Sequence, residues 1–357
     1  MSQREIFRTA KLPVFQNKMF ATAAAAQSCP TGDLVLVQDM DSGLIFNAAF
    51  DPSLLVYDSD YQNEQAHSGV FQYHLQDVTE IIGRHFHDKS LIEVGCGKGY
   101  FLEHLKHQGH RVTGVDPAYE GDSPDVLPVC FEPGVGIKGD GIILRHVLEH
   151  MVNPVEFLAQ VAEANGGQGL IYIEVPCFDW ICSSRAWFDL FYEHVNYFRL
   201  DDFYRMFGNV VEAGHIFGGQ YLYVVAELAT LRTPQLGRGE SLEFPADFLA
   251  DIDAWSGRIL QQPGRQHAIW GGASKGVTFA LYMQRAGSPV DMIIDINPAK
   301  QNKYIAVTGL QVLSPEAAME SLSESANMFV MNSNYFDEIV RQSKNKYHYI
   351  KVDHHEF

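Results

Sequence analysis

The alternation of apolar and polar positions divides the chain into three regions. The N-terminal region carries short β-rich runs such as Leu34–Val37 between turn signals. After residue 90, apolar strands alternate with segments of helical period, and a second alternation of this kind begins near Phe244. Such alternation is typical of α/β domains built on a mostly parallel sheet. We therefore predict a small β-rich N-terminal module with a lid segment (1–85), an α/β domain (86–230) and a second α/β domain (244–357).

Size, charge and cysteine usage narrow the class of protein. The 357 residues exceed what one hydrophobic core usually supports. The net charge of −18 argues against a nucleic-acid partner, because phosphates require neutralisation by lysine and arginine. There is no apolar run of ~18 residues and no apolar signal core, so we expect a cytoplasmic protein without a membrane span. The five cysteines form no CxxC pair, which argues against a disulfide scaffold.

A glycine loop after an apolar strand is the first candidate site. Gly95, Gly97 and Gly99 follow the strand Leu91–Val94 and precede a predicted helix. Glycines let a ligand approach the backbone closely, and a helix N-terminus offers free N–H donors. The spacing is GxGxG rather than the GxGxxG of dinucleotide folds, Glu93 lies two residues upstream, and Asp116 ends the next strand. An acid at that strand end can accept ribose hydroxyls, and a carboxylate near the glycines favours an ammonium group. The combination favours S-adenosylmethionine over a nicotinamide cofactor.

This stretch resembles motif I and the following acidic position of class I S-adenosylmethionine-dependent methyltransferases. The resemblance continues through the segments 141–145, 146–150 and 170–176. It implies a class I Rossmann-like domain with S-adenosylmethionine as cofactor, and it places the end of the fourth strand beside that cofactor. The cofactor-binding residues that we predict are Glu93, Gly95, Cys96, Gly97, Gly99, Asp116, Arg145 and His146.

An aromatic segment, 188–198, contains the adjacent pair Glu193 and His194. A carboxylate beside a water-shielded imidazole can tune a base near neutral pH. Glu-His pairs also cap helices and satisfy buried backbone groups, and composition leaves both interpretations open. His146 and His150 are four residues apart and would suit a metal with Glu149. However, there is no HExxH motif and no third histidine at ligand spacing, so we expect no metal.

Taken together, these segments resemble the deoxysugar C-methyltransferase family. The resemblance covers nearly the whole chain and is strong in 192–198, in 270–276, in Asp295–Pro298 and in Met331-Asn332. It implies a small N-terminal module, a methyltransferase domain and a C-terminal Rossmann-like domain. It also implies that His194 is the base, Glu193 its partner, His150 a polar group near the substrate and Tyr61 a hydroxyl on the lid. The polar segment 57–68 that carries Tyr61 can equally be a solvated loop.

Two positions depart from the pattern of that family. Its N-terminal module usually binds zinc through four cysteines, whereas this region contains only Cys29. We therefore expect this module to be held by packing and to contain no structural zinc. A tyrosine two residues before the glutamate in the best-known members is Phe191 here.

A second glycine loop, Gly271–Gly276, follows an apolar strand and opens a helix, and Asp295 lies nineteen residues beyond it. Backbone N–H groups, a helix dipole and Lys275 together would suit an anion. The loop matches neither a P-loop nor a dinucleotide fingerprint, and a purely structural role is almost equally favoured. We predict that Gly272, Ser274 and Lys275 bind substrate, with Lys275 contacting a phosphate.

The function expected from these features is S-adenosylmethionine-dependent methyl transfer to a small sugar-like acceptor, with a nucleotide-linked keto-sugar among the candidates. We expect methylation at carbon through an enolate, with His194 as base. The alternatives are an O- or N-methyltransferase acting on a glycan or another small metabolite, an NAD(P)-dependent oxidoreductase using the C-terminal domain, and a binding protein with a vestigial methyltransferase fold. The sequence leaves open the acceptor, the methylated atom and the choice between monomer and homodimer.

Overall fold

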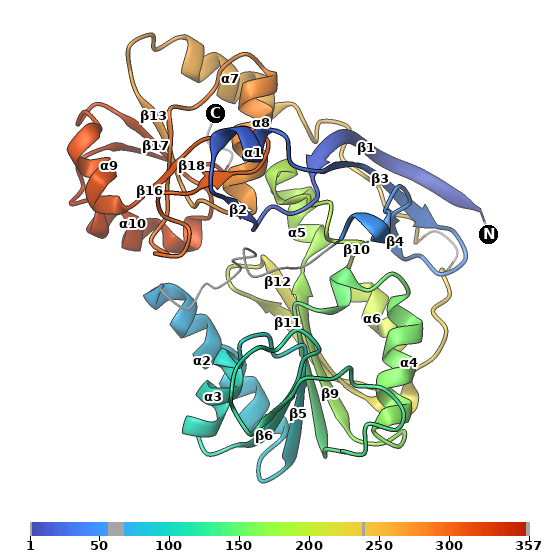
Figure 1. Cartoon of the computed structure of the whole chain (residues 1–357). Coiled ribbons are helices and arrows are strands. Elements are labelled where there is room, and N and C mark those ends of the chain that lie inside the picture. The colour runs from blue at the N-terminus through green and yellow to red at the C-terminus, as the bar shows by residue number, and fades with distance from the viewer. Residues whose placement is uncertain (1, 56–67, 238–239, 355–357) are drawn as a thin grey trace.

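Three main sheets organise the chain in the computed structural model, which describes residues 2–55, 68–237 and 240–354. A seven-stranded sheet occupies the lower half of Figure 1, and a five-stranded sheet forms the C-terminal domain above it. A four-stranded sheet, mostly from the N-terminal region, lies alongside. The α/β fold class is confirmed.

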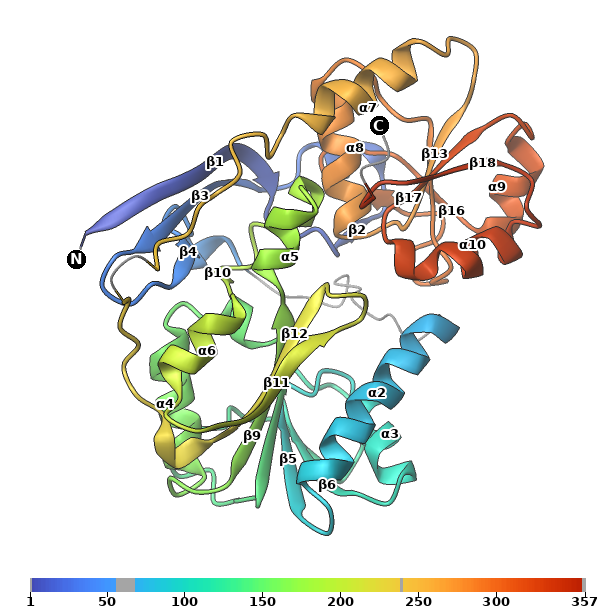
Figure 2. The same cartoon turned by 180° about the vertical axis from the view of Figure 1, so that it is seen from behind.

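The seven-stranded sheet has the order β11-β12-β9-β8-β5-β6-β7. Neighbours from β9 to β7 are parallel, and the β12–β11 hairpin adds two antiparallel strands at one edge. Helices α2 and α3 cover one face, and α4 and α6 cover the other (Figures 1 and 2). Since both faces are covered, β5 and β8 are apolar and buried nearly throughout. The elements are α2 (Gly69–His85), β5 (Ser90–Val94), α3 (Tyr100–His107), β6 (Arg111–Val115), β7 (Val126–Leu127), β8 (Gly141–Arg145), α4 (Pro154–Ala164), β9 (Leu170–Pro176), α5 (Phe178–Ser183), α6 (Leu200–Met206), β11 (Val210–Ile216) and β12 (Tyr221–Glu227).

Helix α2 belongs to this sheet, although we had assigned its residues to the N-terminal module. Its buried side chains, among them Leu75 and Ile82, share one apolar cluster with Leu91 of β5 and Leu105 of α3. The boundary predicted at residue 85 therefore falls after a helix that packs on the seven-stranded sheet. We propose that this domain begins at Ser68, whose side chain caps α2 by accepting from the backbone N–H of Phe71 over 3.3 Å.

The C-terminal domain has a parallel five-stranded sheet of order β16-β14-β13-β17-β18. Its first strand, β13, leads through the second glycine loop into helix α8, as the sequence pattern predicts. The elements are α7 (Asp251–Leu260), β13 (His267–Trp270), α8 (Lys275–Arg285), β14 (Met292–Ile294), β15 (Tyr304–Ile305), β16 (Val312–Leu313), α9 (Pro315–Ser321), β17 (Asn327–Val330), α10 (Phe336–Gln342) and β18 (His348–Lys351).

The N-terminal region contacts both α/β domains. Its antiparallel sheet is completed by β10, which follows His194 within the second region of the chain. Its strand β2 pairs with β15 of the C-terminal domain. The elements are β1 (Gln3–Pro13), β2 (Met19–Phe20), α1 (Ala23–Gln27), β3 (Thr31–Asp39), β4 (Ile45–Asn47) and β10 (Asn196–Tyr197).

One apolar core joins the N-terminal strands to the C-terminal domain. Leu12 and Leu36 belong to the same buried cluster as Trp187 and Phe279. The rings of Trp187 and Phe279 stack with centroids 5.5 Å apart. Burial of this shared surface holds the three parts together and fixes the space between them.

Candidate active site

The first glycine loop has the backbone that its glycines predict. Gly95, Gly97 and Gly99 have φ values of 73°, 54° and 77°, a region that side chains disfavour. A Cβ on Gly95 would lie 2.4 Å from a methyl carbon of Val147, so a side chain there would clash. A Cβ on Gly97 would meet no heavy atom of the described residues within 4 Å. The loop thus leaves space in front of its backbone.

Asp116 lies beside this loop, as predicted from its place at the end of β6. Its Oδ2 accepts from the Gly97 N–H over 2.8 Å, and its Oδ1 accepts from the Ala118 N–H over 2.8 Å. Cys96 is buried and packs toward β6, where a Cβ on Gly114 would come within 2.7 Å of its sulfur. Cys96 therefore shapes the loop through packing.

The Glu93 side chain is buried next to the glycine loop, and one of its carboxylate oxygens makes no hydrogen bond within the described part of the chain. The residue is 4% exposed, and its Oε2 has no hydrogen-bond partner among the described residues. Burial raises the pKa of Glu93 to about 7; Arg145 opposes this rise and Asp116 adds to it. A buried carboxylate with an unused acceptor fits the ammonium group of S-adenosylmethionine. The residues of the loop therefore fit the predicted cofactor.

Arg145 and His146 are held by Glu174, a residue that we had not assigned to the site. Arg145 donates to Glu174 from Nε over 2.8 Å, and His146 Nε2 lies 3.1 Å from the same carboxylate. His74 Nε2 lies 2.8 Å from it as well. Although burial opposes ionisation, Arg145 and the two histidines hold the pKa of Glu174 well below its usual range. The Arg145 guanidinium also lies over the ring of Phe101, 4.3 Å from its centroid, and makes a cation–π contact with it.

His146 carries a charge at neutral pH. Burial alone would lower the pKa of His146, but hydrogen bonds to Glu149 and Glu174 outweigh it and raise the pKa to about 9. His146 is the first residue after β8 and lines a cavity. Because β8 and β5 are parallel neighbours, His146 and the glycine loop lie at the same edge of the sheet.

This cavity, of about 250 Å³, lies between the two α/β domains and also touches Asn17 of the N-terminal region. Its aromatic lining comes from Phe191, Tyr221, Trp270 and Tyr335. Several ionisable side chains line it as well; they are His146, Glu149, His150, Asp189, His194, Lys275, Asp295, Lys300 and Glu338. An apolar hollow with converging polar groups at a domain junction is the usual form of a small-molecule site.

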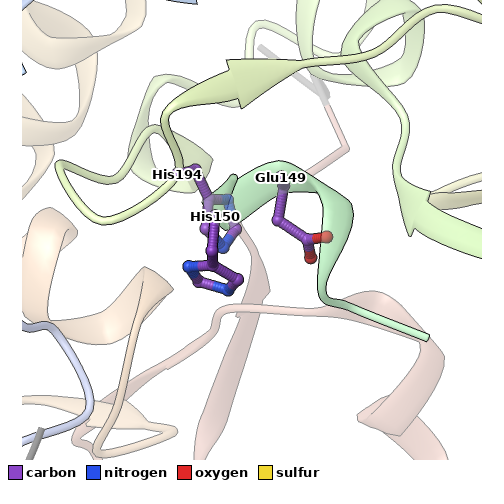
Figure 3. Close-up of side chains that lie close together, drawn as sticks. All are labelled: Glu149, His150 and His194. Carbon is purple, nitrogen blue, oxygen red and sulfur yellow. The ribbon is translucent and has the colours of Figure 1, made fainter. Parts of the chain in front are cut away.

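His150 and His194 face this cavity together with Glu149. Figure 3 shows Glu149 and His150 on the short turn Leu148–His150 and His194 on the segment before β10. Ligand atoms of the three side chains lie within 4.8 Å of one another. Burial and the adjacent His150 lower the pKa of His194 to about 3, although Glu149 opposes this. His194 is therefore a neutral imidazole at physiological pH.

Glu149, a residue that we had not assigned to the site, brings a carboxylate close to His194. Glu193 is buried, and the Gln16 amide, with its nitrogen turned toward Glu193 Oε1, donates over 3.2 Å. The backbone carbonyl of Glu193 accepts from His150 Nδ1 over 2.9 Å. The backbone of Glu193 thus orients the His150 ring. Tyr61, the predicted lid hydroxyl, lies outside the described residues.

Two family sequence models match the chain over these regions. One, described as a methyltransferase domain, matches residues 66–210, and the other, described as a C-methyltransferase C-terminal domain, matches residues 258–350. The chain is an S-adenosylmethionine-dependent methyltransferase. These matches favour a methyltransferase over the two alternatives of an oxidoreductase and of a binding protein with a vestigial methyltransferase fold.

The individual proteins that resemble this methyltransferase share low sequence identity with it. C-methyltransferase NovU of Streptomyces niveus is 24% identical over 293 residues, which cover 71% of this chain and 69% of that protein. The structure of plantazolicin methyltransferase BpumL with SAH is 15% identical, covers 44% of this chain and 84% of that one, and has a TM-score of 0.35. The 1,6-didemethyltoxoflavin-N1-methyltransferase of Burkholderia thailandensis is 14% identical, covers 53% and 97%, and has a TM-score of 0.34. Both structural likenesses are partial.

Lys275 of the second glycine loop, which we had predicted to contact a phosphate, lines the cavity and also contacts the methyltransferase domain. Lys275 Nζ lies 3.0 Å from Asp189 Oδ2, donates to Gln220 Oε1 over 2.8 Å, and lies 4.8 Å from the centroid of the Trp180 ring. The methyltransferase domain thus already neutralises this charge. Ser274 lines the cavity, and its hydroxyl lies 2.9 Å from Asn17 Oδ1. Gly272 does not line the cavity; its N–H donates to Asp295 Oδ2 over 2.8 Å.

The residues that we missed share one kind of signal. Glu174 is an acid inside the apolar run 170–176, and Asp189 is an acid inside an aromatic run. A charged residue in such a run is buried only when it is paired, so each one indicated a buried network. The partners could not be assigned from the sequence, since they lie far away along the chain.

Among the described residues, no helix is both long enough and apolar enough to cross a bilayer.

Proposed function

We propose that this methyltransferase transfers the methyl group of S-adenosylmethionine to a carbon atom of a small sugar-like acceptor. Acceptors that carry a ketone, including nucleotide-linked keto-sugars, are the favoured class. The observation that carries the proposal is the position of His194, which lines a cavity at the same sheet edge as the glycine loop and lies close to the Glu149 carboxylate. The match to a C-methyltransferase C-terminal domain and the similarity to NovU support methylation at carbon.

The cofactor would be held by the first glycine loop. Gly95 and Gly97 would accommodate its amino-acid part, Glu93 its ammonium group and Asp116 its ribose. When bound, S-adenosylmethionine supplies an electrophilic methyl group on a sulfonium. The protein's contribution is to align the acceptor and to keep water away from it.

His194 would act as the general base. It takes the proton from the carbon next to the ketone, and the C–H electron pair forms the enolate. The enolate carbon then forms the new C–C bond to the methyl group as the carbon–sulfur bond breaks. The Glu149 carboxylate, which lies close to His194, would stabilise the imidazolium that His194 becomes. A positioned base contributes roughly 10²–10⁴ in rate.

A proton-exchange assay tests carbon chemistry and the base together. With the demethylated cofactor and a keto-sugar nucleotide in deuterated water, we expect the α-proton of the acceptor to exchange. His194→Ala and His194→Asn should abolish both exchange and methyl transfer while calorimetry shows unchanged cofactor affinity. Glu149→Gln should slow both reactions, and Glu193→Gln should slow them less, because its carboxylate does not line the cavity.

The outcomes separate the rival assignments. Methyl transfer to a hydroxyl or amine without any exchange would identify an O- or N-methyltransferase. Full activity in His194→Ala would remove His194 as base under either chemistry.

A further inference from the structure

Two imidazoles and one carboxylate lie close together (Figure 3). All three residues line the cavity. The rings of His150 and His194 have centroids 5.0 Å apart and are inclined at 83°. Two imidazoles bound to one ion through metal–nitrogen bonds of about 2.0–2.1 Å place their centroids about 5 Å apart. The two histidines therefore have the spacing of two ligands of one metal ion.

The tautomer of His150 suits this role. Its Nδ1 faces the carbonyl oxygen of Glu193 at 2.9 Å. A carbonyl only accepts, so Nδ1 carries the hydrogen, and in the neutral ring the lone pair is then on Nε2. Metal-binding histidines are commonly oriented by such a bond from the other ring nitrogen to a backbone carbonyl.

Glu149 supplies an independent indication of a cation. Its side chain is 2% exposed, and Oε1 lies 3.4 Å from His146 Nδ1. Its Oε2 is buried and has no hydrogen-bond partner among the described residues. A buried carboxylate oxygen without a partner is destabilising, and coordination to a cation would satisfy it.

We propose that Glu149, His150 and His194 bind a divalent transition-metal ion such as Co²⁺ or Zn²⁺. Two histidines and one carboxylate would leave further coordination positions open, and all three residues line the cavity. A metal ion bound to His194 would occupy a ring-nitrogen lone pair, and the proposed function needs such a lone pair to accept the proton. Metal occupancy therefore inhibits methyl transfer, and this consequence, unlike binding itself, depends on the proposed function.

The test uses the full chain after treatment with a chelator, with Co²⁺ followed by visible absorption and Zn²⁺ by calorimetry. We expect one ion per chain at this site. His150→Ala and His194→Ala should each weaken binding at least about tenfold. The exposed His215 serves as the matched control, and His215→Ala should leave binding unchanged. Zn²⁺ should inhibit methyl transfer by the wild-type enzyme, and chelation should restore it.

Binding failure and functional failure can be distinguished. If neither ion binds, or if both histidine variants bind as tightly as wild type, the metal site is refuted while methyl transfer remains open. If binding follows the variants but the chelated enzyme is inactive and regains activity with metal, the site stands, and the inhibitory consequence is refuted along with His194 as base.

Discussion

Glu93 shows how one buried side chain can set the conditions for cofactor binding. The pKa of Glu93 rises to about 7 mainly because burial disfavours the carboxylate. An ammonium group next to it would reverse that preference, since the charged pair is favoured where water is excluded. Cofactor affinity should therefore depend on the protonation of this one carboxyl.

We predict that affinity for S-adenosylmethionine falls as the pH is lowered through about 7. Below this value Glu93 is protonated in the free protein and must lose its proton on binding, which weakens binding by up to about tenfold per pH unit. Above it the affinity should level off. Calorimetry at several pH values measures this slope.

Glu93→Gln should remove most of the slope, and Glu103→Gln, on the exposed side of α3, should leave it intact. A slope of the same size in the Glu93 variant would assign the linkage to another group.

At the scale of elements, an ion-pair network ties α2 to the β11–β12 hairpin. Glu212 of β11 accepts from Arg84 and His85 of α2 and, over 2.7 Å, from Tyr223 of β12. Burial alone would raise the pKa of Glu212, but these partners outweigh it and lower the pKa to about 2. The network and the apolar face of α2 together attach this helix to the sheet edge.

We predict that Glu212→Gln lowers the free energy of unfolding by about 1–2 kcal/mol at pH 7, a range limited by the partial solvation of the pair. Because the folded pKa is depressed, the stabilisation is present above the unfolded value of about 4.3 and is lost as the pH falls toward 2. Urea unfolding of wild type and variant at pH 7 and pH 3 measures both values. Glu80→Gln, at an exposed position of α2, should change stability little at either pH. An equal loss for Glu212→Gln at both pH values would contradict the titration argument.

At the scale of the molecule, polar contacts across the cavity fix the two α/β domains relative to each other. Lys275 of α8 pairs with Asp189, and the amides of Gln220 and Asn332 donate to each other over 2.8 Å. Glu338 of α10 accepts from the Ser68 hydroxyl at the start of α2 over 3.0 Å. These contacts define the cavity that the proposed acceptor would enter.

We predict that Lys275→Ala lowers the free energy of unfolding by about 3 kcal/mol, because it leaves Asp189 buried without its counter-charge. The double variant with Lys275→Ala and Asp189→Asn should lose less than the sum of these two single variants, with a coupling of about 1–3 kcal/mol. Equilibrium unfolding of the four proteins gives this coupling. Additive effects, together with a raised KM for a nucleotide-linked acceptor in Lys275→Ala, would return Lys275 to the phosphate-binding role.

The sequence alone determined the features that depend on neighbours along the chain. The GxGxG turn requires left-handed backbone that glycine supplies, and alternating strands and helices specify an α/β sheet. Parallel strands end at one edge, so Glu93, the glycine loop and Asp116 could be placed together without a structure. The same reasoning brought the end of β8 to this edge.

The tertiary structure decided which charges meet. His194 lies close to Glu149, forty-five positions away along the chain, because packing of distant segments brings these side chains together. Lys275 is neutralised by Asp189, eighty-six positions away, and α2 packs on the sheet rather than with the N-terminal strands. The local sequence pattern specifies backbone conformation and burial. The partner of a buried charge depends instead on how whole helices and strands pack against each other, and the candidate catalytic centre consists of charges that are paired in this way.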